Sequence, residues 1–316
     1  MTKSDENAVV VEDLTKRYKD VTAVDRISFT IRKGEVFAFL GPNGAGKTST
    51  VEVIETIRKP TSGTVHVLGM DVAKQKRDIV RRIGVLPQAF NSFDRLTVRE
   101  SLRYYARLFD RGYADVDGLI ELTDLVDKRD AQFKTLSGGL KQRLGIAIAL
   151  VNDPEIVFLD EPTTGLDPRA RRDLWLILLN LKQKGKTVFL TTHYIEEAEL
   201  LADTVAIISK GQIVAMAPPH DLIECNANYM NVTLKNVDAK AFEMIRGMRF
   251  DPVQDGRNIR FHVKHADDVC QLLTTVRGAG LSIPGLDVRK PNLEEVYLQL
   301  TGETLGKVPQ VDGESA

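Results

Sequence analysis

The sequence predicts an α/β fold built on a mostly parallel β-sheet, followed by a small α+β domain. Three short apolar runs, at residues 36–40, 156–159 and 187–190, lack polar alternation, which is typical of strands buried on both faces. Helical patterns at 142–151 and 169–184 precede the last two runs. Buried strands that alternate with helices indicate a parallel sheet covered by helices on its faces.

Antiparallel strands are expected at both ends of this sheet-forming region. Residues 9–11 and 27–31 flank the region of Tyr18 and read as two strands. Residues 205–214 read as a closing hairpin that turns at Lys210 and Gly211. The sheet is therefore predicted to be mixed, with a parallel centre.

The hydrophobic pattern restarts on a smaller scale after the pair of prolines at 218 and 219. Strands are expected at 230–234 and around Phe261, helices at 239–248 and around Leu272, and an extended segment at 281–288. A capping box between Asn292 and Glu295 is expected to open a final helix. We therefore predict a main domain at 1–219, a small accessory or regulatory domain at 220–303, and a disordered tail at 304–316.

The composition excludes several classes of protein. The 316 residues include 43 Lys and Arg against 44 Asp and Glu, so the net charge is 43 − 44 = −1, and no nucleic-acid partner is expected. With two cysteines, Cys225 and Cys270, a disulfide-stapled secreted domain is excluded. No apolar run approaches the roughly 20 residues of a spanning helix, and the polar N-terminus predicts no secretory signal.

A glycine-rich segment after the first apolar run fits the phosphate-loop pattern G-x-x-x-x-G-K-[ST]. It consists of Gly41, Pro42, Asn43, Gly44, Ala45, Gly46, Lys47 and Thr48. Its glycines let backbone N–H groups converge on phosphate oxygens at the start of a helix. Lys47 can neutralise the β- and γ-phosphates, and the Thr48 hydroxyl can ligate Mg²⁺. A nucleoside triphosphate site in a P-loop NTPase fold is therefore predicted.

Two carboxylates follow the second apolar run. Asp160 and Glu161 are adjacent, and since side chains alternate along a strand they are expected to point in different directions. Asp160 suits Mg²⁺, through water, and Glu161 can act as the general base for an attacking water.

A third motif precedes the acidic strand. Ser137, Gly138 and Gly139 open a helix, with Ser137 at the N-cap and two glycines that expose backbone N–H groups. By themselves these residues fit an ordinary capped helix start. Their place between the phosphate loop and the acidic pair favours a second phosphate-binding surface in a chain that has one phosphate loop.

The order of these motifs, with Gln88, Asp167 and His193 in their places, resembles the ATP-binding subunit of ATP-binding cassette (ABC) transporters over residues 8–220. The resemblance implies a cassette with a mostly parallel sheet, an antiparallel β portion and a helical subdomain. It also implies ATP and Mg²⁺ as ligands and ATP hydrolysis as the reaction.

The family's nucleotide contacts carry over residue by residue. Tyr18 matches the aromatic residue that stacks on adenine, and Ser49 lies beside the phosphate loop. Gln88 matches the glutamine that touches Mg²⁺ and water and senses the membrane partner. Asp160 and Glu161 match the metal-associated aspartate and the catalytic base.

The remaining motifs match residues that act between subunits or sense the nucleotide. Ser137, Gly138 and Gly139 match the signature that meets ATP held by the opposite subunit. Asp167 matches a loop that crosses the dimer interface, and His193 matches the switch histidine near the γ-phosphate. The resemblance implies a second ATP-binding subunit, with two copies expected to form a homodimer, and a separate transmembrane permease. It places the protein at the cytoplasmic face of the membrane.

Two features indicate which branch of the ABC family the chain resembles. Leu140 follows Ser-Gly-Gly where the family commonly has Gln, and aliphatic residues occur there in export branches. Residues 291–302 resemble the end of ATPase subunits in the daunorubicin-resistance-like branch of ABC-2 exporters. Export is therefore expected rather than import.

Two other functions compete with transport. A soluble ABC ATPase acting on ribosomes or DNA would usually carry two cassettes or a long coiled-coil insertion. Here 137 − 47 = 90 residues separate the loop lysine from the signature serine, without sustained heptads. A regulatory cassette that binds ATP without cleaving it is disfavoured because Glu161 and His193 are both present.

Overall fold

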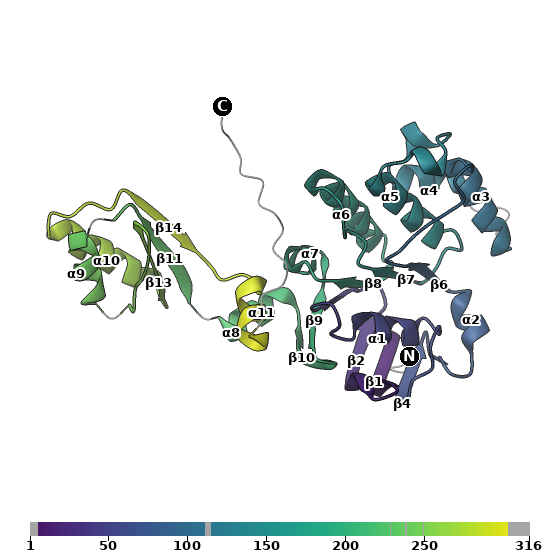
Figure 1. Ribbon diagram of the computed structural model, residues 1–316, viewed down its shortest axis with the longest axis horizontal. Helices are drawn as coiled ribbons and strands as arrows, with labels where there is room; N and C mark the ends of the chain where they lie inside the picture. Colours follow the sequence, from purple (N-terminus) through teal and green to yellow (C-terminus); the bar gives the residue numbers. More distant parts are fainter. Residues whose placement is uncertain (1–5, 111–114, 228, 238, 249, 303–316) are drawn as a thin grey trace. The chain divides into compact units, whose positions relative to one another are not determined.

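The computed structural model of the chain describes residues 6–110, 115–227, 229–237, 239–248 and 250–302. The predicted tail at 304–316 lies outside this range. The chain divides into two compact units, one that ends at Pro219 and one that spans His220–Gly302 (Figure 1). No helix within the described ranges is both long and apolar enough to cross a membrane.

A six-stranded sheet forms the centre of the first unit, in the order β10-β9-β3-β8-β7-β6. Five strands pair in parallel, and β10 pairs antiparallel with β9. This confirms the predicted parallel centre and the closing hairpin. The strands are β3 (Val36–Leu40), β6 (Ile83–Leu86), β7 (Ile156–Asp160), β8 (Thr187–Thr192), β9 (Thr204–Ser209) and β10 (Gln212–Ala217).

The second sheet of this unit is antiparallel, with the order β2-β1-β4-β5. It contains β1 (Asn7–Tyr18), β2 (Val21–Arg32), β4 (Ser62–Val67) and β5 (Met70–Asp71). The hairpin of β1 and β2 turns after Tyr18, as predicted, whereas the pairing of β4 with β1 was not.

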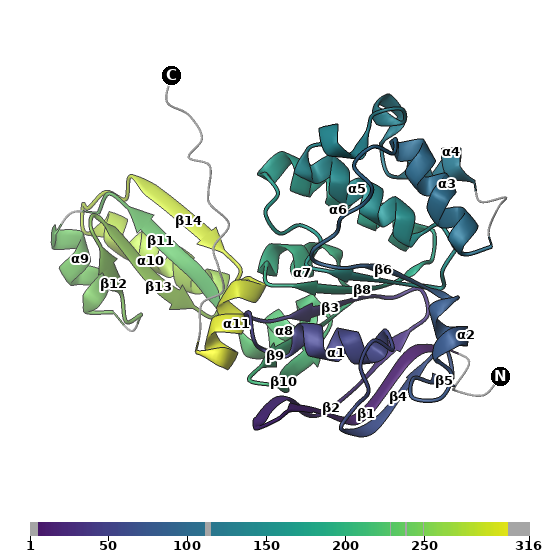
Figure 2. The same cartoon turned by 45° about the vertical axis from the view of Figure 1, so that its right-hand side comes forward.

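The two faces of the parallel sheet carry separate cores, as the alternation of a strand requires. Phe37 and Phe39 of β3 pack with β1, β2, β4 and helix α1 (Lys47–Ile54). Val36 faces the other side, where the core includes residues of α5 (Gly138–Ala149), α6 (Pro168–Gln183) and α7 (Ile195–Leu201). Helix α1 therefore lies between the two sheets, and α6 and α7 cover the opposite face (Figure 2). A short helix, α2 (Lys76–Val80), precedes β6.

A helical subdomain interrupts the alternation of strands and helices between β6 and β7, as the resemblance implies. It contains α3 (Val98–Leu108), α4 (Val116–Leu122) and α5 (Gly138–Ala149), with short 3₁₀ turns at Val126–Lys128 and Phe133–Thr135. Its core joins Leu102 of α3, Ile120 of α4 and Leu144 of α5. Helix α5 begins four residues before the expected 142–151 pattern, because Ser137 caps it.

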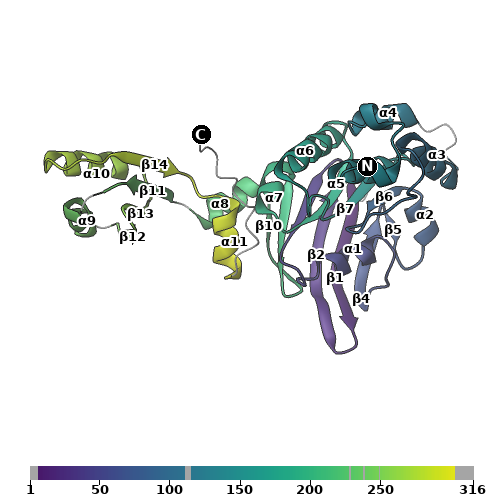
Figure 3. The same cartoon turned by 45° about the horizontal axis from the view of Figure 1, so that its top comes forward.

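The second unit has a β-α-β-β-α-β order, and its antiparallel sheet is arranged β12-β13-β11-β14 (Figure 3). Its elements are α8 (Pro219–Asn226), β11 (Met230–Lys235), α9 (Ala239–Arg246), β12 (Val253–Asp255), β13 (Asn258–Val263), α10 (Ala266–Gly278), β14 (Gly285–Arg289) and α11 (Leu293–Thr301). Both α9 and α10 pack on one face, with Ile245 and Leu272 against Phe261.

Only half of the predicted capping box at α11 forms. Asn292 caps the helix by accepting a hydrogen bond from the backbone N–H of Glu295, 3.1 Å away. The Glu295 carboxylate instead accepts hydrogen bonds from the Asn231 amide at 2.8 Å and from the Tyr229 hydroxyl at 3.3 Å. A tertiary contact with β11 has therefore replaced the local one.

Candidate functional site

The phosphate loop joins the end of β3 to the start of α1, and its backbone requires glycine at specific positions. Gly44 and Gly46 have φ angles of 82° and 107°, in the left-handed region that other residues rarely adopt. A Cβ added to Gly41 would lie 2.4 Å from the carbonyl oxygen of Ile208 on β9. The loop therefore takes this path because three of its residues have no side chain.

A pocket of about 390 Å³ opens over this loop. It is lined by Tyr18, Ala23, Pro42, Asn43, Gly44, Gly46, Lys47, Thr48, Ser49, Gln88 and Glu161. The lining is mostly loop backbone and polar side chains, at the N-terminus of a helix without a side-chain cap. Because the first N–H groups of a helix have no partner inside it, this pocket fits an anion such as a phosphate chain.

Lys47 is buried, with 4% of its side chain exposed, and its ammonium group has three close oxygen partners. It donates to the carbonyl oxygens of Gly41 at 2.7 Å and Pro42 at 3.2 Å. It also forms an ion pair with Oε1 of Glu161 at 3.1 Å. A carboxylate thus neutralises the lysine, and a phosphate in the pocket would compete with it.

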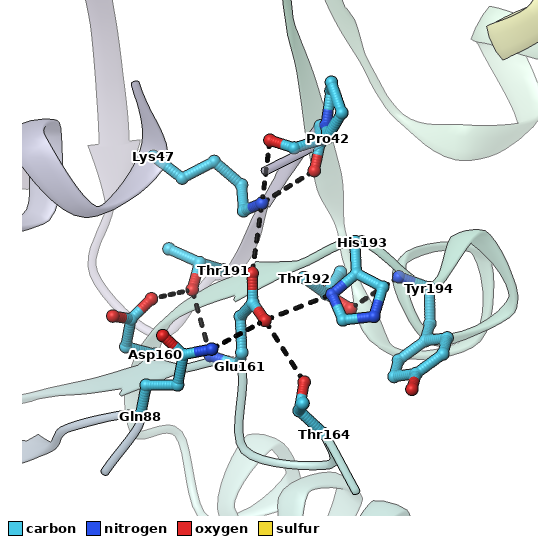
Figure 4. Close-up of polar contacts among 11 residues, drawn as sticks. Pro42, Lys47, Gln88, Asp160, Glu161, Thr164, Thr191, Thr192, His193 and Tyr194 are labelled. Carbon is cyan, nitrogen blue, oxygen red and sulfur yellow. Dashed lines mark hydrogen bonds and ion pairs between the residues drawn. The ribbon is translucent and has the colours of Figure 1, made fainter. Parts of the chain in front are cut away.

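Glu161 lies at the centre of the polar network in Figure 4. Its Oε2 atom is 3.1 Å from Nδ1 of His193, and it accepts hydrogen bonds from the Gln88 amide and the Thr164 hydroxyl, both at 3.2 Å. The structure therefore brings together four residues that are far apart in the sequence: Lys47, Gln88, Glu161 and His193.

The two acidic side chains diverge, but not because strand side chains alternate. Strand β7 ends at Asp160, and Glu161 has a φ angle of 48°, in the left-handed region. The backbone turn at Glu161 aims its carboxylate at Lys47, while Asp160 accepts a hydrogen bond from the Thr191 hydroxyl on β8. The expectation of different directions is correct, but strand alternation was the wrong reason for it.

The contacts of Glu161 and Asp160 move their pKa values in opposite directions. The His193 hydrogen bond and the positive charge of Lys47 lower the pKa of Glu161 to about 2, although burial acts against them. Burial raises the pKa of Asp160, together with the negative charge of Glu161 and against the Thr191 hydrogen bond. Glu161 is therefore an ionised and weakly basic carboxylate at neutral pH.

The residues expected to hold Mg²⁺ are compatible with it. Thr48 presents an exposed hydroxyl at the pocket, and the Asp160 carboxylate is close enough to Thr48 for their interaction to affect its pKa. Within the described ranges, no group of three or more His, Cys, Asp or Glu side chains could hold a metal by itself. A hydroxyl, a carboxylate and phosphate oxygens make the hard oxygen set that Mg²⁺ prefers.

Tyr18 lines the pocket, but its ring already has charged neighbours. The ammonium of Lys16 lies 5.0 Å from the ring centroid, and the guanidinium of Arg58 lies 5.4 Å from it. The hydroxyl lies 3.5 Å from a carboxylate oxygen of Glu52. Stacking on adenine stays a prediction.

The signature residues and Asp167 do not line this pocket. Ser137 and Gly138 are exposed at the start of α5, and Gly139 is buried against Ala170 of α6. Asp167 is exposed and caps α6 by accepting a hydrogen bond from the Ala170 N–H at 2.9 Å. The sequence predicts the N-cap at Ser137, whereas the cap at Asp167 comes from the structure alone.

Two threonines contribute to the site without having been singled out in the sequence. Thr164 donates to Glu161, and Thr191 bonds both to Asp160 and to the backbone N–H of Glu161. Thr191 lies two residues before His193, so the His193 segment carries a signal that could have indicated it.

The glycine loop, the buried lysine and the paired carboxylates define a P-loop nucleotide-binding protein. A model of the ABC transporter family matches residues 24–164, which include the loop, Gln88, Ser137 and both acidic residues. Two relatives named Nod factor export ATP-binding protein I match over most of their length. The protein from Ralstonia nicotianae is 38% identical over 93% of this chain and 94% of its own. The one from Rhizobium etli is 39% identical over 95% of both chains.

Solved structures agree with these relatives. An ATP-binding cassette in a dimeric post-hydrolysis state with ADP and Pi superimposes with a TM-score of 0.61 at 27% identity, over 66% of this chain and 98% of its own. An ATP-binding subunit of an ABC transporter gives the same TM-score and identity over 69% and 92%. The chain belongs to the ABC transporter family of ATP-binding proteins, and it is an ATPase.

Proposed function

We propose that this chain is the ATP-hydrolysing subunit of an exporter, that it acts on a separate membrane permease, and that two copies close around two ATP molecules. One observation carries the proposal. The pocket is lined by the phosphate loop, Gln88 and Glu161, and Glu161 also contacts His193, whereas the second proposed phosphate-binding helix start, at Ser137, is exposed and lies outside it.

Binding begins at the phosphate loop. Backbone N–H groups of the loop and of α1 bind the phosphate oxygens, and Lys47 exchanges its contact with Glu161 for the β- and γ-phosphates. Thr48 and Asp160 would hold Mg²⁺, with Gln88 beside them, and the ion would supply charge neutralisation on the phosphate chain.

Hydrolysis depends on the carboxylate that Lys47 has released. Without the ion pair, the part of the pKa lowering that comes from Lys47 is lost and the part from the His193 hydrogen bond stays, so the carboxylate becomes a somewhat stronger base for an attacking water. His193 then orients Glu161 through Nδ1, and Thr191 orients Asp160.

The exposed start of α5 supports the proposal that a second copy binds there. Ser137 and the N–H groups of Gly138 and Gly139 would meet the γ-phosphate of ATP bound to the partner copy, and Asp167 would lie at the interface. A dimeric cassette among the similar structures supports this arrangement. Export and a peripheral place at the cytoplasmic face of the membrane are supported by the names of the relatives.

The variant Glu161→Gln tests the chemistry. It keeps the size of the side chain and removes the base, so we expect ATP hydrolysis to fall by about 10²-fold or more while ATP binding persists. The variant should also form a stable dimer with ATP in analytical ultracentrifugation. The matched control is Glu155→Gln, whose carboxylate pairs with Arg82 away from the pocket and should leave turnover unchanged. Near-wild-type turnover of Glu161→Gln would exclude Glu161 as the base.

The transport role has a separate test. A six-helix membrane protein encoded next to this chain should co-purify with it and change its ATPase rate in vesicles. Activation by ribosomes or DNA instead would assign the chain to the non-membrane ABC ATPases.

A further inference from the structure

A line of ring and charge contacts reaches Glu161 from helix α6. The guanidinium of Arg171 lies 4.2 Å from the centroid of the Tyr194 ring. That ring lies 4.1 Å from the imidazole of His193, at an interplanar angle of 41°. Nδ1 of His193 is in turn 3.1 Å from Oε2 of Glu161 (Figure 4). Three side chains thus connect α6 with the carboxylate proposed to activate water.

Arg171 carries a positive charge and is nevertheless buried. It is 5% exposed, and its Nε atom has no hydrogen-bond partner within the described part of the chain. Arginine is rarely buried without a partner for its charge. Its guanidinium lies over the face of the Tyr194 ring, and its positive charge lowers the pKa of the fully buried Glu197 against the effect of burial. A cation over an aromatic face interacts more strongly where water is excluded.

Hydrogen bonds hold the backbone of Tyr194, and its ring is in contact with Arg171. The Tyr194 N–H donates to the Thr192 hydroxyl at 2.9 Å, and its carbonyl accepts from the N–H of Ala198 in α7 at 3.3 Å. Helix α7 is held to α6 by a hydrogen bond of 3.1 Å from the Trp175 indole to Glu197. The ring therefore lies between a buried cation and a partly exposed imidazole.

We propose that Arg171 is a positioning residue for ATP hydrolysis, which holds the Tyr194 ring so that this ring keeps Nδ1 of His193 directed at Glu161. The inference rests on the proposed function, because it assigns to His193 the task of orienting the base. Arg171 lines no part of the nucleotide pocket, so its effect belongs to turnover and not to binding.

The first test is Arg171→Met in the full-length protein. It keeps much of the side-chain volume and removes the charge. We expect kcat to fall by about tenfold or more and KM for ATP to change by less than about twofold, since small misplacements of reacting groups are costly. Arg171→Lys should restore part of kcat by returning a cation. The matched control is Arg172→Met, on the exposed side of the same helix, with unchanged kcat.

The second test asks whether Arg171 acts through the ring. Tyr194→Phe keeps the ring and should retain kcat, whereas Tyr194→Leu should lose about as much as Arg171→Met. In the double variant, adding Arg171→Met to Tyr194→Leu should lower kcat by less than about twofold more. A full additional tenfold loss would overturn the inference, as would wild-type kcat in a folded Arg171→Met.

Folding and the proposed function are controlled separately. Thermal unfolding of each variant shows whether it is folded, and if Arg171→Met is not, the pair Tyr194→Phe and Tyr194→Leu decides: equal kcat values overturn the inference. The proposed function fails if the wild type does not hydrolyse ATP or if Glu161→Gln keeps its turnover. The inference alone fails if those two results are as expected while Arg171→Met and Tyr194→Leu keep wild-type kcat.

Discussion

Two helices of the first unit begin at glycine-rich segments, and their N-termini differ in nearly every physical respect. Helix α1 starts after Gly46, has no side-chain cap, and carries the buried Lys47 at its first position. Helix α5 starts at Gly138, is capped by Ser137, and is exposed at its start. The N-terminus of α1 lines a pocket and has a lysine beside it, whereas the N-terminus of α5 is exposed to solvent.

The difference shows what a phosphate site needs from its surroundings. A helix N-terminus offers unpaired N–H groups and a partial positive charge wherever it lies. At α1, the glycine loop, Lys47 and the Glu161 network surround that charge, so the site can bind a triphosphate by itself. At α5, the Ser137 side chain accepts a hydrogen bond from the Leu140 N–H, and in the proposed function the pocket of a second copy would complete the site.

Lys47→Ala tests the start of α1, and we expect it to have the largest effect of these variants on ATP binding and hydrolysis. The change removes the cation at the β- and γ-phosphates, so ATP affinity measured by calorimetry should fall by about 10²-fold or more, and hydrolysis should fall to background. The α5 end is untouched by this change. Unchanged affinity would refute the assignment of this pocket to phosphate.

Ser137→Arg tests the open end and should separate binding from hydrolysis. The long side chain blocks the approach of a second copy but not the α1 pocket, from which Ser137 is absent. We expect hydrolysis to fall by about 10²-fold, the ATP-dependent dimer to be lost in ultracentrifugation, and the affinity of the monomer for ATP to change little. Hydrolysis at the wild-type rate would show that the two helix starts do not cooperate.

At the start of α1, Lys47 forms an ion pair with Glu161, and the contribution of Glu161 to the free energy of unfolding should depend on pH. The pKa of Glu161 is lowered from 4.5 to about 2 in the folded protein. The stabilisation that the His193 hydrogen bond and Lys47 together give the ionised carboxylate is therefore present above about pH 4.5 and is lost as the pH falls towards 2, up to about 3 kcal/mol at roughly 1.4 kcal/mol per pKa unit.

Urea unfolding without nucleotide measures this effect. The difference in unfolding free energy between the wild type and Glu161→Gln should be constant above about pH 5.5 and shrink as the pH is lowered. The exposed Glu155→Gln should show a much smaller pH dependence. A difference that does not vary with pH would mean that neither His193 nor Lys47 stabilises the ionised carboxylate in solution.

A truncated chain that ends at Pro219 should show the smallest change in ATP binding among these variants. No residue that lines the nucleotide pocket comes from His220–Gly302. We expect KM for ATP to stay within about twofold of the full-length value, with weaker coupling to the permease. If a folded, monodisperse truncate failed to bind ATP, the small unit would belong to the catalytic unit.

The sequence by itself determined the features that depend on neighbouring residues. The phosphate loop, the caps at Ser137 and Asn292, and the alternation of buried strands with helices are all local patterns, and the structure contains each of them. Local patterns are readable because backbone geometry and hydrogen bonding within a few residues specify them.

The tertiary structure decided the features that join distant segments. The pair of Lys47 with Glu161, the hydrogen bond of Glu295 to Asn231, and the stack of Arg171 on Tyr194 connect residues with no periodic relation in the chain. The left-handed turn at Glu161 is likewise maintained by contacts that come from other strands and loops. Such contacts form only after the sheet has brought its strand ends together, so no local pattern specifies them.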